Sequence, residues 1–138
     1  MVDRTTILGK VAIIDECLRR IDEVRGREGL ERRDVEEIVI LNLQRAIQAG
    51  IDVATHVIAT EGLGLPDSLA DAFSRLGKAG ILNEALADRL KRMVGFRNVV
   101  VHAYEAVDPD VVEAIVESRL VDLRDLSREI IERFRLGE

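Results

Sequence analysis

The sequence is poor in the residue types that stabilise small disulfide-rich or metal-bound folds. Its 138 residues include one cysteine, two prolines, two histidines, three phenylalanines, one tyrosine and no tryptophan. A single cysteine, Cys17, excludes an intrachain disulfide and agrees with a reducing compartment. Two histidines and one cysteine give neither an H-E-x-x-H nor a C-x-x-C spacing, so we expect no metal site and no cofactor. With so few aromatic residues, the core must consist mainly of Leu, Ile, Val and Ala, which suits close packing of helices.

Long apolar runs and nucleotide-binding loops are also absent from the sequence. No run approaches the ~18–20 apolar residues of a membrane span, and the opening segment MVDRTTILGK lacks the apolar core of a secretory signal. There is no P-loop or G-x-G-x-x-G motif, and none of the four serines lies in a G-x-S-x-G elbow. We therefore expect a cytoplasmic protein outside the membrane, and neither a P-loop enzyme nor a serine hydrolase.

Charge is distributed unevenly along the chain. The net charge of −6 argues against a protein that coats nucleic acid with its whole surface. Residues 75–102, however, hold six Lys or Arg against two Asp or Glu, which gives this segment a balance of +4. The basic segment could bind a phosphate chain locally, or it could be an ordinary solvated helix face.

Apolar residues recur at helical spacing through most of the chain, and we expect one domain over residues 1–138. The predicted helices cover about 4–25, 33–60, a short stretch within 66–80, 83–104 and 109–134. Glycine- or proline-containing breaks such as RGREG and EGLGLP separate several of them. Gly95, inside the fourth helix, is a candidate kink. No segment has the pattern of a strand, so the expected fold is all-α, an up-and-down bundle of four longer helices plus one short helix.

The stretch GFRNVVVHAYEAVDP (95–109) contains the most strand-like residues of the chain, but it fits a helix better. As a strand, both of its faces would mix polar and apolar residues. On a helix that advances about 100° per residue, the two kinds separate. The apolar side, which we expect to pack against the core, comprises Phe96, Val99, Val100 and Ala103. The polar side carries Arg97, Asn98, His102 and Tyr104.

The polar side of this helix has the residue types for metal-free phosphate chemistry. Arg97 is a permanent planar cation that can hold two phosphate oxygens, and His102 can exchange a proton near neutral pH. Asn98, one turn before His102, can orient the imidazole or donate to an oxyanion. This combination suits cleavage of RNA by its own 2′-hydroxyl. Taken alone, however, a single histidine on a helix is more often a hydrogen-bonded structural residue.

The helix predicted at 33–60 carries a second polar stripe. Asp52 and His56 are four residues apart on it, close enough for the carboxylate to orient the imidazole. The stripe is either a solvated face with an incidental pair or one wall of a polar groove. The other members of the stripe are Gln44, Arg45, Gln48 and Thr55.

The motif RNVVVHAY, residues 97–104, resembles the R-N-x-x-x-H signature of HEPN domains, and its R-x4-H-x-Y form is similar to the HepT branch. The segments NLQRAIQAGIDVATHVIA and GLPDSLADAFSRLGKAGIL resemble the second helix and the middle segment of that family, so the similarity covers most of the chain. The resemblance implies an all-helical homodimer in which two R-N-x-x-x-H segments line a shared cleft. It also implies the toxin of a toxin–antitoxin pair, a metal-independent endoribonuclease in which His102 transfers protons and Arg97 binds the phosphate or transition state.

The resemblance further implies a partner, MntA, a minimal nucleotidyltransferase that acts as the antitoxin by attaching AMP to Tyr104. The helical projection puts Tyr104 within about 20° of Arg97, where an added phosphodiester would compete with the substrate phosphate. The plain alternative for Tyr104 is a helix-end residue with an apolar body and a wet hydroxyl. Because some HEPN proteins bind or scaffold, the alternative function is a non-catalytic helical dimer that docks the nucleotidyltransferase.

Overall fold

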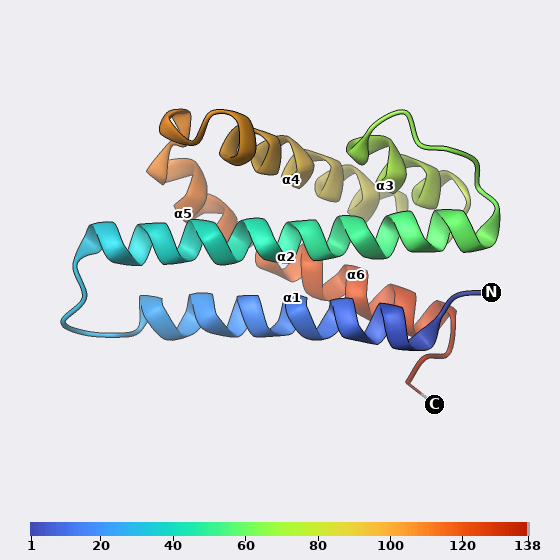
Figure 1. The fold of residues 1–138 in the computed structure, drawn as a ribbon, viewed down its shortest axis with the longest axis horizontal. Helices are drawn as coiled ribbons and strands as arrows, with labels where there is room; N and C mark the ends of the chain where they lie inside the picture. The colour runs from blue at the N-terminus through green and yellow to red at the C-terminus, as the bar shows by residue number, and fades with distance from the viewer. Residues whose placement is uncertain (138) are drawn as a thin grey trace.

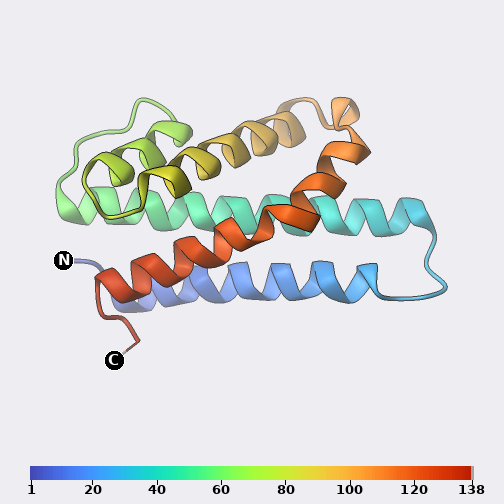
Figure 2. The ribbon, with the colours of Figure 1, turned by 180° about the vertical axis from the view of Figure 1, so that it is seen from behind.

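The computed structural model describes residues 1–137, which form a bundle of helices with no strand among them (Figure 1). The elements are α1 (Arg4–Arg25), α2 (Arg32–Glu61), α3 (Leu69–Lys78), α4 (Glu84–His102), the 3-10 turn η1 (Tyr104–Ala106), α5 (Pro109–Ser118) and α6 (Leu120–Arg133). The long helices α1 and α2 form an antiparallel hairpin; α3 and α4 lie along the other side of α2. The helix α6 runs diagonally across the hairpin, on the side turned to the viewer in Figure 2. The predicted all-α, up-and-down bundle is confirmed.

Local capping signals explain where most helices begin and end. Asp3 precedes α1, and its Oδ1 accepts hydrogen bonds from the backbone N–H groups of Thr5 (3.0 Å) and Thr6 (3.4 Å). These bonds, those to Thr6 above all, hold the pKa of the Asp3 carboxyl below its ordinary value. The helix α2 ends at Gly62, whose φ of 65° is left-handed. Pro109 starts α5 because its fixed φ suits the first turn of a helix.

The helix predicted at 109–134 is two helices in the structure. The chain leaves helical geometry at Arg119, where φ is −119° and ψ is −7°, and α5 turns away from the line of α6 (Figure 2). The N–H of Arg119 still donates to the Ile115 carbonyl at 2.8 Å, and the N–H of Asp122 donates to the Arg119 carbonyl at 3.0 Å. No glycine or proline lies at this junction to indicate a break, and the apolar spacing continues across it. The sequence therefore predicts one continuous helix here. By contrast, α4 continues through Gly95 without the candidate kink becoming a break.

The core is centred on the α1–α2 hairpin and is closed by α6. Its fully buried aliphatic side chains include Ile7, Ile14, Leu18 and Ile21 from α1 and Leu43, Ile47, Ile51 and Ile58 from α2. Gly50 of α2 lets α6 approach closely, because a Cβ at this position would lie 3.1 Å from a methyl group of Leu126. Cys17 is buried here, and its burial raises the pKa of the thiol. The helix packing therefore rests on aliphatic side chains, as the composition indicates.

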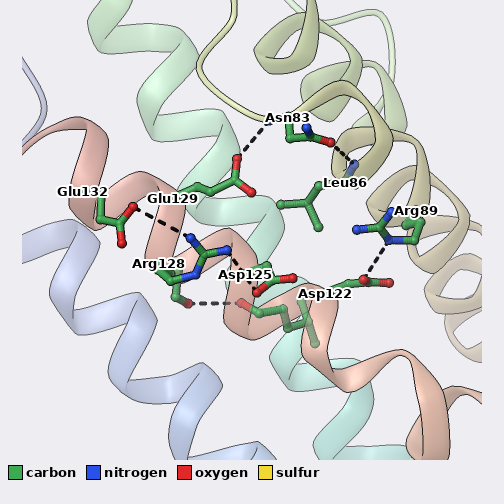
Figure 3. Close-up of polar contacts among 10 residues, drawn as sticks. Asn83, Leu86, Arg89, Asp122, Asp125, Arg128, Glu129 and Glu132 are labelled. Carbon is green, nitrogen blue, oxygen red and sulfur yellow. Dashed lines mark hydrogen bonds and ion pairs between the residues drawn. The ribbon is translucent and has the colours of Figure 1, made fainter.

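Two polar contacts join α4 to α6 at the side of the bundle (Figure 3). Arg89 Nε donates to Asp122 Oδ1 at 2.9 Å, and the backbone N–H of Asn83 donates to Glu129 Oε1 at 2.9 Å. Asp122 is only 1% exposed, and its second oxygen is buried with no hydrogen-bond partner in residues 1–137. The side chain of Arg89 is 31% exposed, so the pair is buried on the Asp122 side only, and loss of either partner would leave the other uncompensated.

Candidate active site

Arg97 lies on the side of α4 that faces the core. The buried residues of this helix are Leu86, Ala87, Leu90, Met93, Val94 and Val100. At about 100° per residue, Arg97 falls in the middle of the stripe formed by the first five. Its Nε is buried and has no hydrogen-bond partner among the described residues, whereas its Nη1 donates to Oδ1 of the exposed Asn98 at 3.1 Å. The stem of Arg97 therefore continues the core stripe; its guanidinium is buried at Nε and reaches the exposed Asn98 through Nη1.

The apolar side expected to pack against the core is only partly buried. Val100 is 4% exposed and Phe96 is half-buried against the core, as predicted. For Val99, which is 41% exposed, and for the exposed Ala103, the prediction is wrong. The reason is that the core lies on the Leu90–Arg97 side of the helix. Val99 instead faces α5 across an open groove.

His102 is the last residue of α4 and is exposed. Five residues of helix separate it from Arg97 by about 140° around the axis and about 7.5 Å along it. No hydrogen bond or ion pair joins the two side chains within residues 1–137. By this helical geometry, the two residues project from α4 in different directions.

Tyr104 lies outside α4, so two predictions about it are wrong. The helix ends at His102 instead of continuing to Tyr104, because Ala103 adopts φ −149° and ψ 57°. Tyr104 then begins η1, and its carbonyl accepts the N–H of Val107 at 3.1 Å. Its angle to Arg97 on a helical projection consequently has no meaning. Tyr104 is 49% exposed, so about half of the residue surface is accessible from outside the chain.

Asp52 and His56 contact α1 and its N-terminal cap instead of each other. Asp52 forms an ion pair with Lys10 at 3.0 Å and accepts a hydrogen bond from Gln48 at 3.0 Å. The ring Nε2 of His56 accepts the backbone N–H of Asp3 at 3.1 Å. Neither residue contacts Arg97 or His102 through a polar bond in the described part of the chain. The structure therefore brings together Arg97 and Asn98, and it assigns Asp52 and His56 to a separate polar surface of the α1–α2 hairpin.

A groove of about 640 Å³ lies beside the motif, between α4, η1 and α5. Outside the 95–109 stretch, Arg89 and Arg92 belong to the basic segment already identified in the sequence, whereas Arg119 and the apolar residues of α5 were not singled out. The local charge balance of residues 75–102 was therefore a signal for the α4 side of the groove alone. Its apolar walls include Met93, Phe96, Val99, Val107, Val111 and Ile115.

The described residues contain no group of three or more His, Cys, Asp or Glu side chains that could hold a metal ion. Along the same residues, no helix combines the length and the apolar character needed to cross a membrane.

Comparisons with known proteins agree on one family. Residues 14–130 match the family model described as "Ribonuclease HepT-like". The chain is 39% identical to "mRNA nuclease HepT" of Shewanella oneidensis, over 84% of this chain and 89% of that protein. It is 37% identical to "tRNA nuclease HepT" of Aphanizomenon flos-aquae, over 67% of this chain and 63% of that one. Among solved structures, it is similar to the tri-AMPylated Shewanella oneidensis HEPN toxin in complex with MNT antitoxin, with a TM-score of 0.86, 36% identity and coverage of 92% and 97%.

Proposed function

This chain belongs to the HepT-like ribonuclease family, and we propose that it is the toxin of a toxin–antitoxin pair that cleaves RNA in the cytoplasm without a metal ion. The observation that carries the proposal is the RNVVVH segment at the end of α4. It combines a guanidinium emerging from the core stripe with an exposed imidazole at the helix end. The relatives named mRNA nuclease and tRNA nuclease support RNA as the substrate class.

The proposed reaction is attack by the RNA's own 2′-hydroxyl. His102 removes the proton from this hydroxyl as its oxygen forms a bond to the adjacent phosphorus. The bond from phosphorus to the 5′-oxygen breaks, and an imidazolium returns a proton to the leaving oxygen. The products are a 2′,3′-cyclic phosphate and a 5′-hydroxyl. Arg97, held by Asn98, stabilises the negative charge that develops on the phosphorane oxygens.

We propose that the active enzyme is a homodimer. In one protomer Arg97 and His102 point in different directions, so one site would gain from a second copy that contributes the missing group. Val101, on the same side of α4 as Arg97, is 42% exposed and offers an uncovered apolar contact beside it. Two basic α4 segments would also give the RNA more phosphate contacts than one acidic protomer provides.

Asp52 and His56 belong to this proposal as groove-lining residues. Their polar surface on the α1–α2 hairpin would extend the RNA track of the dimer, because within one protomer they have no polar contact with the motif. Their contacts with Lys10 and Asp3 support a rigid surface rather than a mobile one.

We propose that an MntA-type nucleotidyltransferase antitoxin silences the enzyme by adding AMP to Tyr104. The exposed side chain of Tyr104, two residues after His102, supports this site. The similar HEPN toxin is described as tri-AMPylated and in complex with an MNT antitoxin. Each added nucleotide brings negative charge and bulk next to the end of α4, where substrate phosphate would bind.

The decisive experiment measures cleavage of total cellular RNA by the purified protein in the presence of EDTA. We expect cleavage to continue with EDTA, to be lost in His102→Ala and to fall strongly in Arg97→Lys, because an ammonium group cannot replace the bidentate guanidinium. Arg33→Lys, an exposed arginine on α2, is the matched control and should cleave normally. Cleavage that stops with EDTA and returns with a divalent ion would contradict the metal-free mechanism.

The alternative function is a non-catalytic helical dimer that docks the nucleotidyltransferase. The acidic net charge and the absence of an Arg97–His102 contact in one protomer favour it. Wild-type protein that binds the antitoxin but never cuts RNA, at any concentration that supports the dimer, would establish this alternative.

A further inference from the structure

The groove between α4, η1 and α5 has an apolar interior and a cationic margin. Phe96 and Val99 of α4 face Val111 and Ile115 of α5, and its volume of about 640 Å³ lies in the range of small-ligand sites. Val99 and Val111 are 41% and 45% exposed, so α5 does not close over α4. The groove is therefore an apolar slot that this chain leaves unfilled.

Three arginines line this groove, and two of them have no partner. Arg89 is paired with Asp122, whereas Arg92 and Arg119 are exposed and form no ion pair within residues 1–137. The only acidic residue of the lining is Asp108, next to η1. In a chain whose net charge is −6, two unpaired guanidinium groups beside an apolar slot favour an anionic ligand with an apolar body.

The absence of a side chain at Gly95 leaves additional space in the groove wall. Gly95 lies inside α4, where glycine weakens a helix relative to alanine. A Cβ at Gly95 would meet nothing within 4 Å, so no packing contact in this chain requires a glycine there. Its absent side chain leaves bare helix backbone as part of the groove, and this space is available to a flat group from outside the chain.

His102 lies on the same side of α4 as two residues of the groove, although it is not itself one of the lining residues. Val99 comes three residues before it, and Gly95, seven residues before it, is about two helical turns away along the axis. A ligand that extends from the groove along α4 would therefore approach the imidazole that we propose transfers the proton.

We propose that this groove is a base-binding subsite for the RNA nucleotide next to the cleaved phosphate. The base would insert over Gly95 against Phe96 and the apolar side chains of α5, while Arg92 and Arg119 bind flanking phosphates. The subsite rests on the proposed ribonuclease function and adds to it a direct contact between the groove and one RNA base. A docked protein segment is the competing occupant, but two arginines that form no ion pair within residues 1–137 favour the phosphate-bearing RNA.

The test uses a 2′-O-methyl RNA oligonucleotide of mixed sequence, which cannot be cut because its 2′-oxygen cannot attack. Gly95→Leu fills the slot, and we expect it to weaken binding about tenfold, the size of one lost base–aromatic contact. An abasic oligonucleotide with the same number of phosphates should bind wild type and Gly95→Leu equally. Gly9→Leu is the matched control, because Gly9 also lies inside a helix with nothing within 4 Å of its added Cβ.

A second pair of variants tests the phosphate contacts. Arg92→Gln combined with Arg119→Gln should reduce the slope of log Kd against log salt by about 1.4, since each lost contact to single-stranded RNA contributes about 0.7. Arg19→Gln, an exposed arginine of α1, should leave affinity and slope unchanged. Thermal unfolding of each variant checks its fold. If Gly95→Leu does not fold, the double variant of Arg92 and Arg119 alone tests whether RNA binds at the groove.

The outcomes separate the subsite from the function. If His102→Ala abolishes cleavage while Gly95→Leu and the arginine pair bind the oligonucleotide like wild type, the subsite is wrong and the ribonuclease stands. If no RNA is cleaved, the function fails, and the oligonucleotide assay still tests the groove. Loss of antitoxin binding in Gly95→Leu, with RNA binding intact, would overturn the proposal and assign the groove to a protein.

Discussion

The α1–α2 hairpin and the end of α4 are built from similar aliphatic residues but differ in how completely these are covered. In the hairpin, Ile14 and Ile47 are almost entirely buried, and the two helices run side by side for most of their length (Figure 1). At the end of α4, Val101 and Tyr104 are more than two-fifths exposed, and a groove separates α4 from α5. One region supplies the stability of the fold. The other keeps apolar and cationic groups available to molecules outside the chain.

The largest expected effect on stability comes from the hairpin. Ile47→Ala should lower the free energy of unfolding by about 2–5 kcal/mol, because it removes a fully buried side chain and leaves a cavity. RNA cleavage should persist well below the unfolding temperature. Urea unfolding followed by circular dichroism measures the first quantity and a cleavage assay the second. Loss of cleavage in protein that is still folded would mean that the two regions are not separable.

The next effect concerns the ion pair that joins α4 to α6. Asp122→Ala should cost about 2–4 kcal/mol, because it leaves the partly buried Arg89 without its carboxylate. Asp125→Ala, three residues later on α6, removes a carboxylate paired with Arg128 at the surface and should cost about 0–1 kcal/mol (Figure 3). Equal unfolding midpoints for the two variants in urea would contradict the importance that we assign to burial at Asp122.

Val100 and Val101 are adjacent on α4 but differ in burial, so they compare a covered and an uncovered side of the same helix. Val100→Ala should cost on the order of 1–3 kcal/mol through lost burial and a cavity. Val101→Ala should cost less than about 1 kcal/mol in the protomer, because nearly half of its surface is already in water. We expect Val101→Ala to weaken the dimer instead, which sedimentation at several concentrations would detect. A larger loss of protomer stability for Val101 than for Val100 would show that the core side of α4 is wrongly identified.

The smallest expected effect on stability is at the polar surface of the hairpin. Asp52→Asn and Lys10→Gln each remove the same partly exposed ion pair and should change the free energy of unfolding by about 0–1 kcal/mol. If this surface lines the RNA groove, Asp52→Asn and Lys10→Gln should both change the cleavage rate, because the two side chains form one ion pair there. Identical cleavage by both variants and by wild type would remove Asp52 from the proposed site.

Several features of the fold were predictable because their causes are local. Apolar spacing gave α1 its correct bounds, and it gave α2 bounds within one residue at each end. Pro109 indicated the start of α5 for a reason contained in its own ring. The RNVVVH motif could be read as a helix from residue types and spacing alone, whereas the role of its arginine and histidine in phosphate chemistry stays a prediction.

Residue spacing was enough to group most residues into helices and to show which of them share a side, except at Arg119 and at the end of α4. What each side packs against depended on the arrangement of the helices in space. The tertiary structure directed Arg97 toward the core and Val99 toward a groove, it broke the last helix at Arg119, and it ended α4 before Tyr104. The physical reason is that periodicity records the angle between residues on one helix, whereas burial depends on where distant helices lie. The position of α5 against α4 follows from the Arg119 junction and the packing of α6 on the hairpin, and no local pattern encodes it.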